Sequence, residues 1–194
     1  MAFFRSVSFG EVLPAVSGKG VFMRMPVASD FPEWAALREQ SRDFLTPWEP
    51  IWPPDDLTRS AFRRRLRRYA DDQRSDAAYA FLIFRTEDSA LVGGLTLANI
   101  RRGVAQAGSI GYWTGRPFAN QGYMTAAMRE LVPFCFSTLG LHRLEAACIP
   151  TNAASVRLLE KTGFQREGYA RSYLCINGEW QDHLLYARLK DDID

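Results

Sequence analysis

The sequence has few of the side chains that build metal centres and disulfides, with three cysteines and two histidines among 194 residues. Cys135, Cys148 and Cys175 are odd in number, lie far apart and form no C-x-x-C pair. Together with His142 and His183 they show no metal-ligand spacing, so we expect no metal site. Free thiols are typical of a reducing compartment, and we predict a cytoplasmic protein. A secreted protein with one disulfide is the alternative that the cysteine count leaves open.

Long apolar runs and an excess of one charge are also missing. No apolar stretch approaches the ~18 residues that a membrane-spanning helix needs, and Arg5 and Glu11 interrupt the place of a signal peptide. We therefore expect no membrane partner. Lysine and arginine total 24 against 22 aspartates and glutamates, which gives a net charge of +2. This balance argues against direct nucleic-acid binding through bulk electrostatics.

What is present is the composition of a globular domain, with 47% hydrophobic and 24% charged residues. A chain of this length is expected to fold as one domain with its own core. Residues 1–20 lack periodicity and contain three glycines and a proline, so we predict an irregular N-terminal arm. A single domain then covers residues 21–190.

Hydrophobic periodicity predicts the elements of this domain. Strands are expected at 21–25, 78–84, 91–98, 107–113, 144–149, 165–176 and 180–189. Helices are expected at 30–42, 55–72, 124–135 and 152–162. Pro133 predicts a kink or an end in the third helix, and Asn177-Gly178 predicts a tight hairpin turn. This order indicates an α/β fold with a mixed sheet of about seven strands and about four helices, not a doubly wound sheet.

Two surface segments have a functional and a structural interpretation. The aromatic, proline-rich loop around Trp48 and Trp52 either lines a binding cleft or packs on its own core. Five arginines between Arg63 and Arg68 either contact an anionic partner such as RNA or form a solvated helix face. We favour the solvated face, because charge runs on helices usually face water.

The segment from Ile110 to Ala127 combines a strand, a loop with glycine and proline, and the start of a helix. Such a loop offers free backbone N–H groups at the positive end of a helix dipole, which suits a pyrophosphate. Gly122 allows close approach of the backbone, and Thr125 adds a hydroxyl donor. Many strand–loop–helix turns bind nothing, however. Asn152 and Ser155 begin the next helix, where Asn152 caps the helix, binds a ligand, or does both.

Together these segments resemble the GCN5-related N-acetyltransferase (GNAT) superfamily over about residues 20–189. The C-terminal third, with Asn177-Gly178-Glu179-Trp180 and Asp182-His183, resembles the RimJ-type branch that acetylates the N-terminal alanine of ribosomal proteins. The resemblance implies the GNAT fold, a mostly antiparallel sheet, and acetyl-CoA as co-substrate. It implies that the following residues bind acetyl-CoA: Tyr112, Trp113, Thr114, Asn120, Gln121, Gly122, Tyr123, Met124, Thr125, Asn152 and Ser155.

The chain departs from the family pattern at three places. Ala119, Gly122 and Met124 stand where the family usually has R/Q-x-x-G-x-G/A, so one of two glycines remains. Asn120 replaces a glycine that the branch often carries, and asparagine tolerates the positive φ better than most residues. Leu159 stands where many members have a tyrosine that protonates the departing thiolate.

The resemblance further implies direct acetyl transfer to an amine without an acyl-enzyme. None of the cysteines has an obvious histidine partner, which agrees with this. A general base must take a proton from the protonated amine, and we predict Glu167, with Asp182 and His183 as alternatives. Ser155 is the predicted proton donor or thiolate partner in place of the missing tyrosine. Glu167 as an exposed surface carboxylate and Ser155 as a local helix residue are the structural alternatives.

The leading hypothesis is an acetyl-CoA-dependent N-acetyltransferase that acts on the N-terminal α-amine of a ribosomal protein, such as one of the small subunit. The same fold acting on a small amine is the second hypothesis. The third is a CoA-binding module without turnover, which the missing tyrosine and loop glycine support. Labelled acetyl-CoA offered with peptides and with small amines distinguishes the first two, and thiol release distinguishes both from the third.

Overall fold

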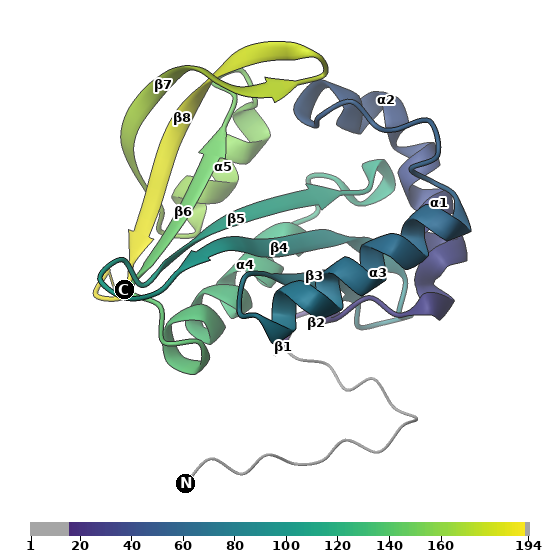
Figure 1. Ribbon diagram of the computed structural model, residues 1–194, viewed down its shortest axis with the longest axis horizontal. Coiled ribbons are helices and arrows are strands. Elements are labelled where there is room, and N and C mark those ends of the chain that lie inside the picture. The colour runs from purple at the N-terminus through teal and green to yellow at the C-terminus, as the bar shows by residue number, and fades with distance from the viewer. Residues whose placement is uncertain (1–15, 193–194) are drawn as a thin grey trace, which may run out of the picture.

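The computed structural model describes residues 16–192, which form one eight-stranded sheet with helices on both faces (Figure 1). The strand order is β1-β2-β3-β4-β5-β6-β8-β7. All neighbours are antiparallel except β5 and β6, which are parallel. The strands are β1 (Val16–Gly18), β2 (Val21–Arg24), β3 (Tyr79–Arg85), β4 (Leu91–Arg101), β5 (Ala107–Thr114), β6 (Arg143–Cys148), β7 (Gln165–Ile176) and β8 (Glu179–Leu189).

The predicted mixed α/β class is confirmed, with one strand more than expected. Val16–Gly18 was predicted as part of an irregular arm, but it pairs with β2 through the tight turn at Gly20, which has φ +80°. Glycine adopts this left-handed conformation without a steric penalty. The rest of the predicted arm lies outside the described residues.

Five α-helices accompany the sheet. They are α1 (Phe31–Gln40), α2 (Arg42–Leu45), α3 (Arg59–Arg74), α4 (Tyr123–Pro133) and α5 (Ala153–Lys161). The first predicted helix is interrupted at Ser41, whose buried hydroxyl accepts a hydrogen bond from the distant Arg116 N–H at 2.9 Å. The second begins later than predicted, because Thr58 caps it by accepting from Ala61 N–H.

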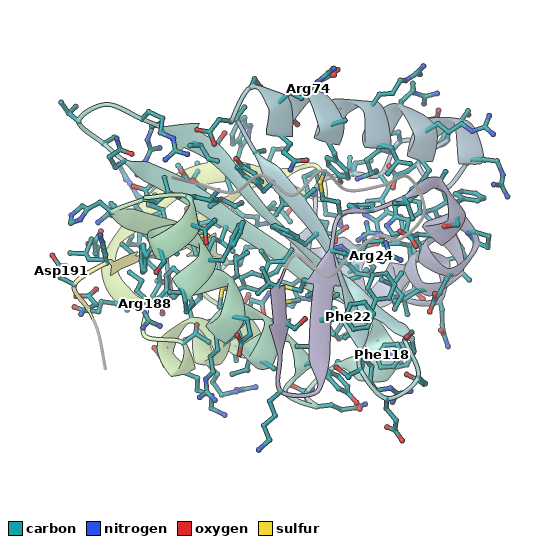
Figure 2. All side chains as sticks on the ribbon, turned by 90° about the horizontal axis from the view of Figure 1, so that it is seen from below. Phe22, Arg24, Arg74, Phe118, Arg188 and Asp191 are labelled. Atoms are coloured by element: carbon teal, nitrogen blue, oxygen red, sulfur yellow. The ribbon has the colours of Figure 1, made fainter. Side chains whose placement is uncertain are left out.

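The sheet separates two cores, and the strand period of two decides which side chain enters which core. Phe81 and Ile83 of β3 belong to the larger core, which α4 covers, while Leu82 and Phe84 belong to the smaller core under α1 and α3. Figure 2 shows α3 and α4 on opposite sides of the sheet. The fold therefore has three layers, with the sheet between two helical layers.

Two helix ends behave as the sequence predicts. The α-helix α4 ends at Pro133, and a π-helical turn (Phe134–Thr138) continues the chain, because proline has no N–H for the helical ladder. Helix α5 ends in a left-handed Gly163 with φ +77°. The N–H groups of Gly163 and Phe164 donate to the carbonyls of Glu160 and Leu159, the bond pair of a Schellman motif.

The parallel pair β5 and β6 is joined only at one end. Its register runs from Ala107–Arg143 to Ser109–Glu145, whereas β5 continues to Thr114 and β6 to Cys148. Beyond Ser109 the strands diverge, and β6 turns upward in Figure 1 with β7 and β8. This divergence leaves the backbone of the last β5 residues without a neighbour from β6, and it opens the sheet beside α5.

Candidate active site

A cavity of about 440 Å³ lies where β5 and β6 diverge. Its walls come from the end of β5, the loop before α4, the starts of α4 and α5, and the segment from Phe44 to Glu49. Ten of the eleven residues predicted to bind acetyl-CoA line it, and Gln121 is the exception. The Gln121 side chain instead donates to the Pro117 carbonyl at 2.7 Å and holds the loop together.

The start of α4 faces this cavity with free backbone donors. No side chain within residues 16–192 caps the helix, and its first turn closes with the bond from Ala126 N–H to the Gly122 carbonyl at 2.9 Å. Asn120 and Gly122 adopt left-handed conformations, with φ +59° and +86°. A Cβ on Gly122 meets nothing within 4 Å, so the backbone conformation requires this glycine, not close packing.

Helix α5 contributes Ser155 to a part-buried polar pair with Tyr112 of β5. Asn152 caps the helix by accepting from Ser155 N–H at 3.1 Å, as predicted. The Ser155 hydroxyl lies 2.5 Å from the Tyr112 hydroxyl of β5, and both residues line the cavity. Burial raises the pKa of Tyr112, so this phenol stays protonated near neutral pH. The pair therefore places two protonated hydroxyl groups at the wall of the cavity.

Two cations at the cleft were not among the predicted residues. Arg157 and Lys161 of α5 line the cavity and are solvent-exposed. They are four residues apart and so lie on one face of the helix, beyond its capped start. That spacing is a signal in the sequence that could have identified them.

Glu49 is a further residue that the sequence analysis missed. It is the one carboxylate among the described residues that line this cavity. Its oxygens accept two hydrogen bonds from Arg38, at 2.7 and 2.6 Å, and one from Trp52 Nε1 at 2.7 Å. Its backbone carbonyl accepts from Asn177 N–H at 2.9 Å, which ties the β7–β8 turn to this loop. These contacts join segments distant in sequence, so local patterns could not reveal them.

The tryptophan loop combines both of its predicted roles. Trp48 lines the cavity, whereas Trp52 packs under the Arg38 guanidinium, 4.1 Å from the ring centre. A short 3-10 turn (Thr46–Trp48) forms where the prolines had suggested no regular element. Proline fits the first residues of such a turn, because their N–H groups need no partner inside it.

Glu167, the predicted general base, does not line the cavity. It lies on β7, the outermost strand, with β8 between it and β6. Its carboxylate accepts two hydrogen bonds from Arg143, one of them at 3.0 Å. Arg143 lowers the pKa of Glu167 by this pairing. An exposed, ion-paired carboxylate at this position fits the structural alternative better than the catalytic one.

The two alternative bases are also occupied elsewhere. Asp182 accepts from the Tyr169 hydroxyl and, at 2.8 Å, from Ser172 N–H. The buried His183 ring has its Nδ1 2.9 Å from the Gln181 carbonyl and packs edge-on against Tyr173. Neither side chain lines the cavity.

The cysteines and Leu159 show no feature of a nucleophile or a proton donor. Cys135 and Cys148 are buried, Cys175 is exposed, and all three are free thiols. Burial raises the pKa of Cys135 to about 12 and raises that of Cys148, which opposes formation of a thiolate nucleophile. Leu159 is fully buried in the larger core and offers no proton.

Residues 16–192 contain neither a membrane-spanning helix nor a metal-binding cluster. No helix there is long and apolar enough to span a membrane. The same residues contain no group of three or more histidine, cysteine, aspartate or glutamate side chains that could hold a metal ion.

The class of this protein follows from comparison with known families. Residues 21–165 match the family model of the acetyltransferase (GNAT) domain, and the chain belongs to this family of N-acetyltransferases. The fold agrees, because the structure superimposes on Mycobacterium smegmatis RimJ in complex with CoA-disulfide. The TM-score is 0.86 and the identity 29%, and the match covers 94% of this chain and 88% of that one.

Two relatives place the chain more closely within the family. It is 37% identical over 177 residues to the probable N-acetyltransferase YjcK of Bacillus subtilis (strain 168), covering 91% of this chain and 98% of the relative. It is 32% identical over 153 residues to the [ribosomal protein uS5]-alanine N-acetyltransferase of Escherichia coli (strain K12), covering 79% of each.

Proposed function

We propose that this enzyme transfers the acetyl group of acetyl-CoA to the N-terminal α-amine of a polypeptide, an alanine of a ribosomal protein. The uncapped start of α4, facing a cleft between diverging strands, is the observation that carries the donor half of this proposal. The relative that acts on uS5 alanine supports the acceptor half. A cytoplasmic location goes with such an acceptor and stays a prediction.

The cleft suits the parts of acetyl-CoA. Backbone N–H groups at the start of α4 and the positive end of its dipole favour a pyrophosphate. Arg157 and Lys161 add positive charge for the phosphates of the nucleotide end. The unpaired edge of β5 from Tyr112 to Thr114 offers N–H and carbonyl groups to the amide-containing arm and the thioester carbonyl.

None of the described residues that line the cleft is an unpaired carboxylate, and this favours an α-amine as acceptor. An α-amino group has a pKa of about 8, so roughly a tenth of it is already neutral at pH 7. A lysine-like amine, with a pKa of about 10.4, is almost entirely protonated and needs a strong base. Both Glu49 oxygens already accept hydrogen bonds, from Arg38 and Trp52, so this carboxylate is poorly placed to take a proton from the amine.

Ser155 is the proposed proton source for the departing CoA sulfur. Attack of the neutral amine on the thioester carbonyl forms the C–N bond, the positively charged nitrogen loses a proton to solvent, and the C–S bond breaks to release a thiolate. The Ser155 hydroxyl can donate to that thiolate, and Tyr112, 2.5 Å away, can donate to Ser155 in turn. Solvent returns a proton to the Tyr112 and Ser155 pair after the sulfur has been protonated. Both hydroxyls lie at the cavity wall.

Mass spectrometry of ribosomal-protein N-termini, with and without this enzyme, tests the acceptor directly. We expect one N-terminal alanine to gain an acetyl group only when the active enzyme is present. Purified enzyme with acetyl-CoA should release thiol with a matching peptide and much less with polyamines or amino acids. Faster turnover of a small amine than of any peptide would contradict the peptide acceptor but not the acetyltransferase activity.

A further inference from the structure

A second cavity, of about 220 Å³, lies on the other side of Trp113, between the sheet and helices α1 and α3. Trp113 and Glu49 line both cavities. The Trp113 indole lies across Gly94 of β4, where an added Cβ would be 2.4 Å from its Nε1. The indole and the Glu49 side chain therefore separate the acetyl-CoA cleft from a second space, adjacent to the point where we place the thioester.

The second cavity has a polar lining inside an otherwise apolar layer. Apolar cavities in proteins can stay empty, but polar ones are occupied by water or ligand. A volume of 220 Å³ corresponds to roughly seven waters at about 30 Å³ each, enough for a small side chain and a peptide group. The polar lining residues are Arg38, Glu49, Arg65, Tyr69 and Thr96.

Arg38 supplies an unused hydrogen-bond donor in this wall. Its side chain is 8% exposed, and its terminal nitrogens both donate to Glu49. Its guanidinium lies against the Trp52 and Trp113 rings, 4.1 and 4.8 Å from their centres. Its Nε is buried and has no hydrogen-bond partner within the described chain. A buried donor without a partner is unfavourable, and an incoming oxygen acceptor would remove that cost.

Arg65 supplies a second cation on the α3 side of the cavity. It donates to the nearly buried Asp56 at 2.6 Å and lies over the Trp34 ring, 5.2 Å from its centre. The positive charges of Arg38 and Arg65 are thus balanced by Glu49 and Asp56. A balanced, donor-rich wall suits a neutral carbonyl oxygen better than a free cation or a purely apolar group.

We propose that the second cavity is the specificity pocket for the acceptor and binds a carbonyl-type oxygen carried next to the reactive amine. The structure offers Arg38, Arg65 and Tyr69 as donors to that oxygen while the amine meets the thioester beside Trp113. This inference rests on the proposed function and adds that the enzyme recognises the acceptor through the carbonyl oxygen next to its amine.

Acceptors that differ only near the amine test this pocket. Alanine amide and an alanine-starting peptide carry an amide carbonyl, alanine carries a carboxylate, and isopropylamine carries neither. With kcat/KM expressed per neutral amine, we expect at least tenfold preference for the amide acceptors over isopropylamine. Equal values for all four would overturn the pocket while leaving acetyl transfer established, whereas no thiol release with any amine would overturn the proposed function itself.

Two substitutions test whether the second cavity causes the preference for amide acceptors. Arg65→Met keeps the length of the side chain and removes its donors, and Tyr69→Phe removes one hydroxyl with less risk to folding. Both should raise KM for alanine amide severalfold or more and reduce its preference over isopropylamine. Arg67→Met, on the exposed face of the same helix, should leave the ratio unchanged. An unchanged ratio in folded Arg65→Met and Tyr69→Phe would show that the cavity holds only water.

Discussion

At the residue scale, the contact between Ser155 and Tyr112 is the feature of the cleft with the clearest chemical consequence. The sequence indicated Ser155 through its place at a helix start, but the same position is also explained by local capping. The structure adds a buried phenol 2.5 Å from its hydroxyl. Local patterns could not predict that partner, because Tyr112 is 43 residues away in the sequence.

Ser155→Ala should lower kcat by about 100-fold, which is the low end of the usual contribution of general acid catalysis. The KM for acetyl-CoA should change little. Alanine is a good helix former, so the variant should fold. Steady-state kinetics with a peptide acceptor measures the effect. Thr151→Ala, at an exposed neighbouring position, is the matched control. An unchanged kcat in Ser155→Ala would assign Ser155 a purely local role.

Glu167→Gln should leave kcat and KM unchanged and lower the free energy of unfolding by at most about 1 kcal/mol, as for an exposed ion pair. Arg143 lowers the pKa of Glu167 below 4.5, so the ion pair stabilises the fold above that pH. This stabilisation is lost when Glu167 becomes protonated on acidification. The stability difference between wild type and variant should therefore shrink as the pH falls through the lowered pKa of Glu167. Chemical denaturation at several pH values measures this stability difference. A large loss of kcat in Glu167→Gln would instead identify Glu167 as the general base.

At the element scale, the start of α4 depends on backbone conformation. Gly122→Ala places a side chain at φ +86° and should cost about 1 kcal/mol of stability. It should also weaken CoA binding, because the free N–H groups shift. Gly111→Ala is the control: its Cβ also meets nothing, but its φ is not positive. Calorimetry with CoA should show weaker binding in the first variant only.

Helix α5 should bind phosphate through its two exposed cations. Arg157→Ala and Lys161→Ala should each raise KM for acetyl-CoA by roughly tenfold, since a hydrogen bond to a charged group contributes about 1.5–3 kcal/mol. Added salt should reduce the difference from wild type, because exposed charges are screened. Arg166→Ala on β7, outside the cleft, should have no effect. An equal KM in all three variants would exclude this phosphate contact.

At the scale of the whole molecule, Trp113 connects the two faces of the sheet and the two cavities. Gly94→Ala should force the indole to move and should destabilise the protein by about 1–3 kcal/mol through overpacking. Because both cavities share this wall, KM for acetyl-CoA and for the acceptor should both rise. Thermal unfolding and two-substrate kinetics measure these effects. A rise in only one KM would show that the indole does not couple the sites.

Exposed ion pairs explain much of the run of arginines on α3. Arg64 pairs with Asp55 at 2.5 Å and Arg74 with Asp71, and Figure 2 shows α3 along the outside of the molecule. These pairs agree with the predicted solvated face. Arg65 differs, because its position on the helix directs it to the second cavity. The run of arginines in the sequence does not distinguish Arg65 from the arginines beside it.

The sequence by itself determined the order of the strands from β2 to β8, the tolerance of Asn120 for a positive φ, and the end of α5 before Gly163. These are local properties, set by periodicity, backbone preference and capping over a few residues. Only the tertiary structure decided that Glu167 lies away from the cleft, that Glu49 lies in it, and that a second polar cavity lies behind Trp113. Those outcomes depend on how far β5 and β6 diverge and on which helix packs over each face, and no local pattern encodes contacts between segments so far apart.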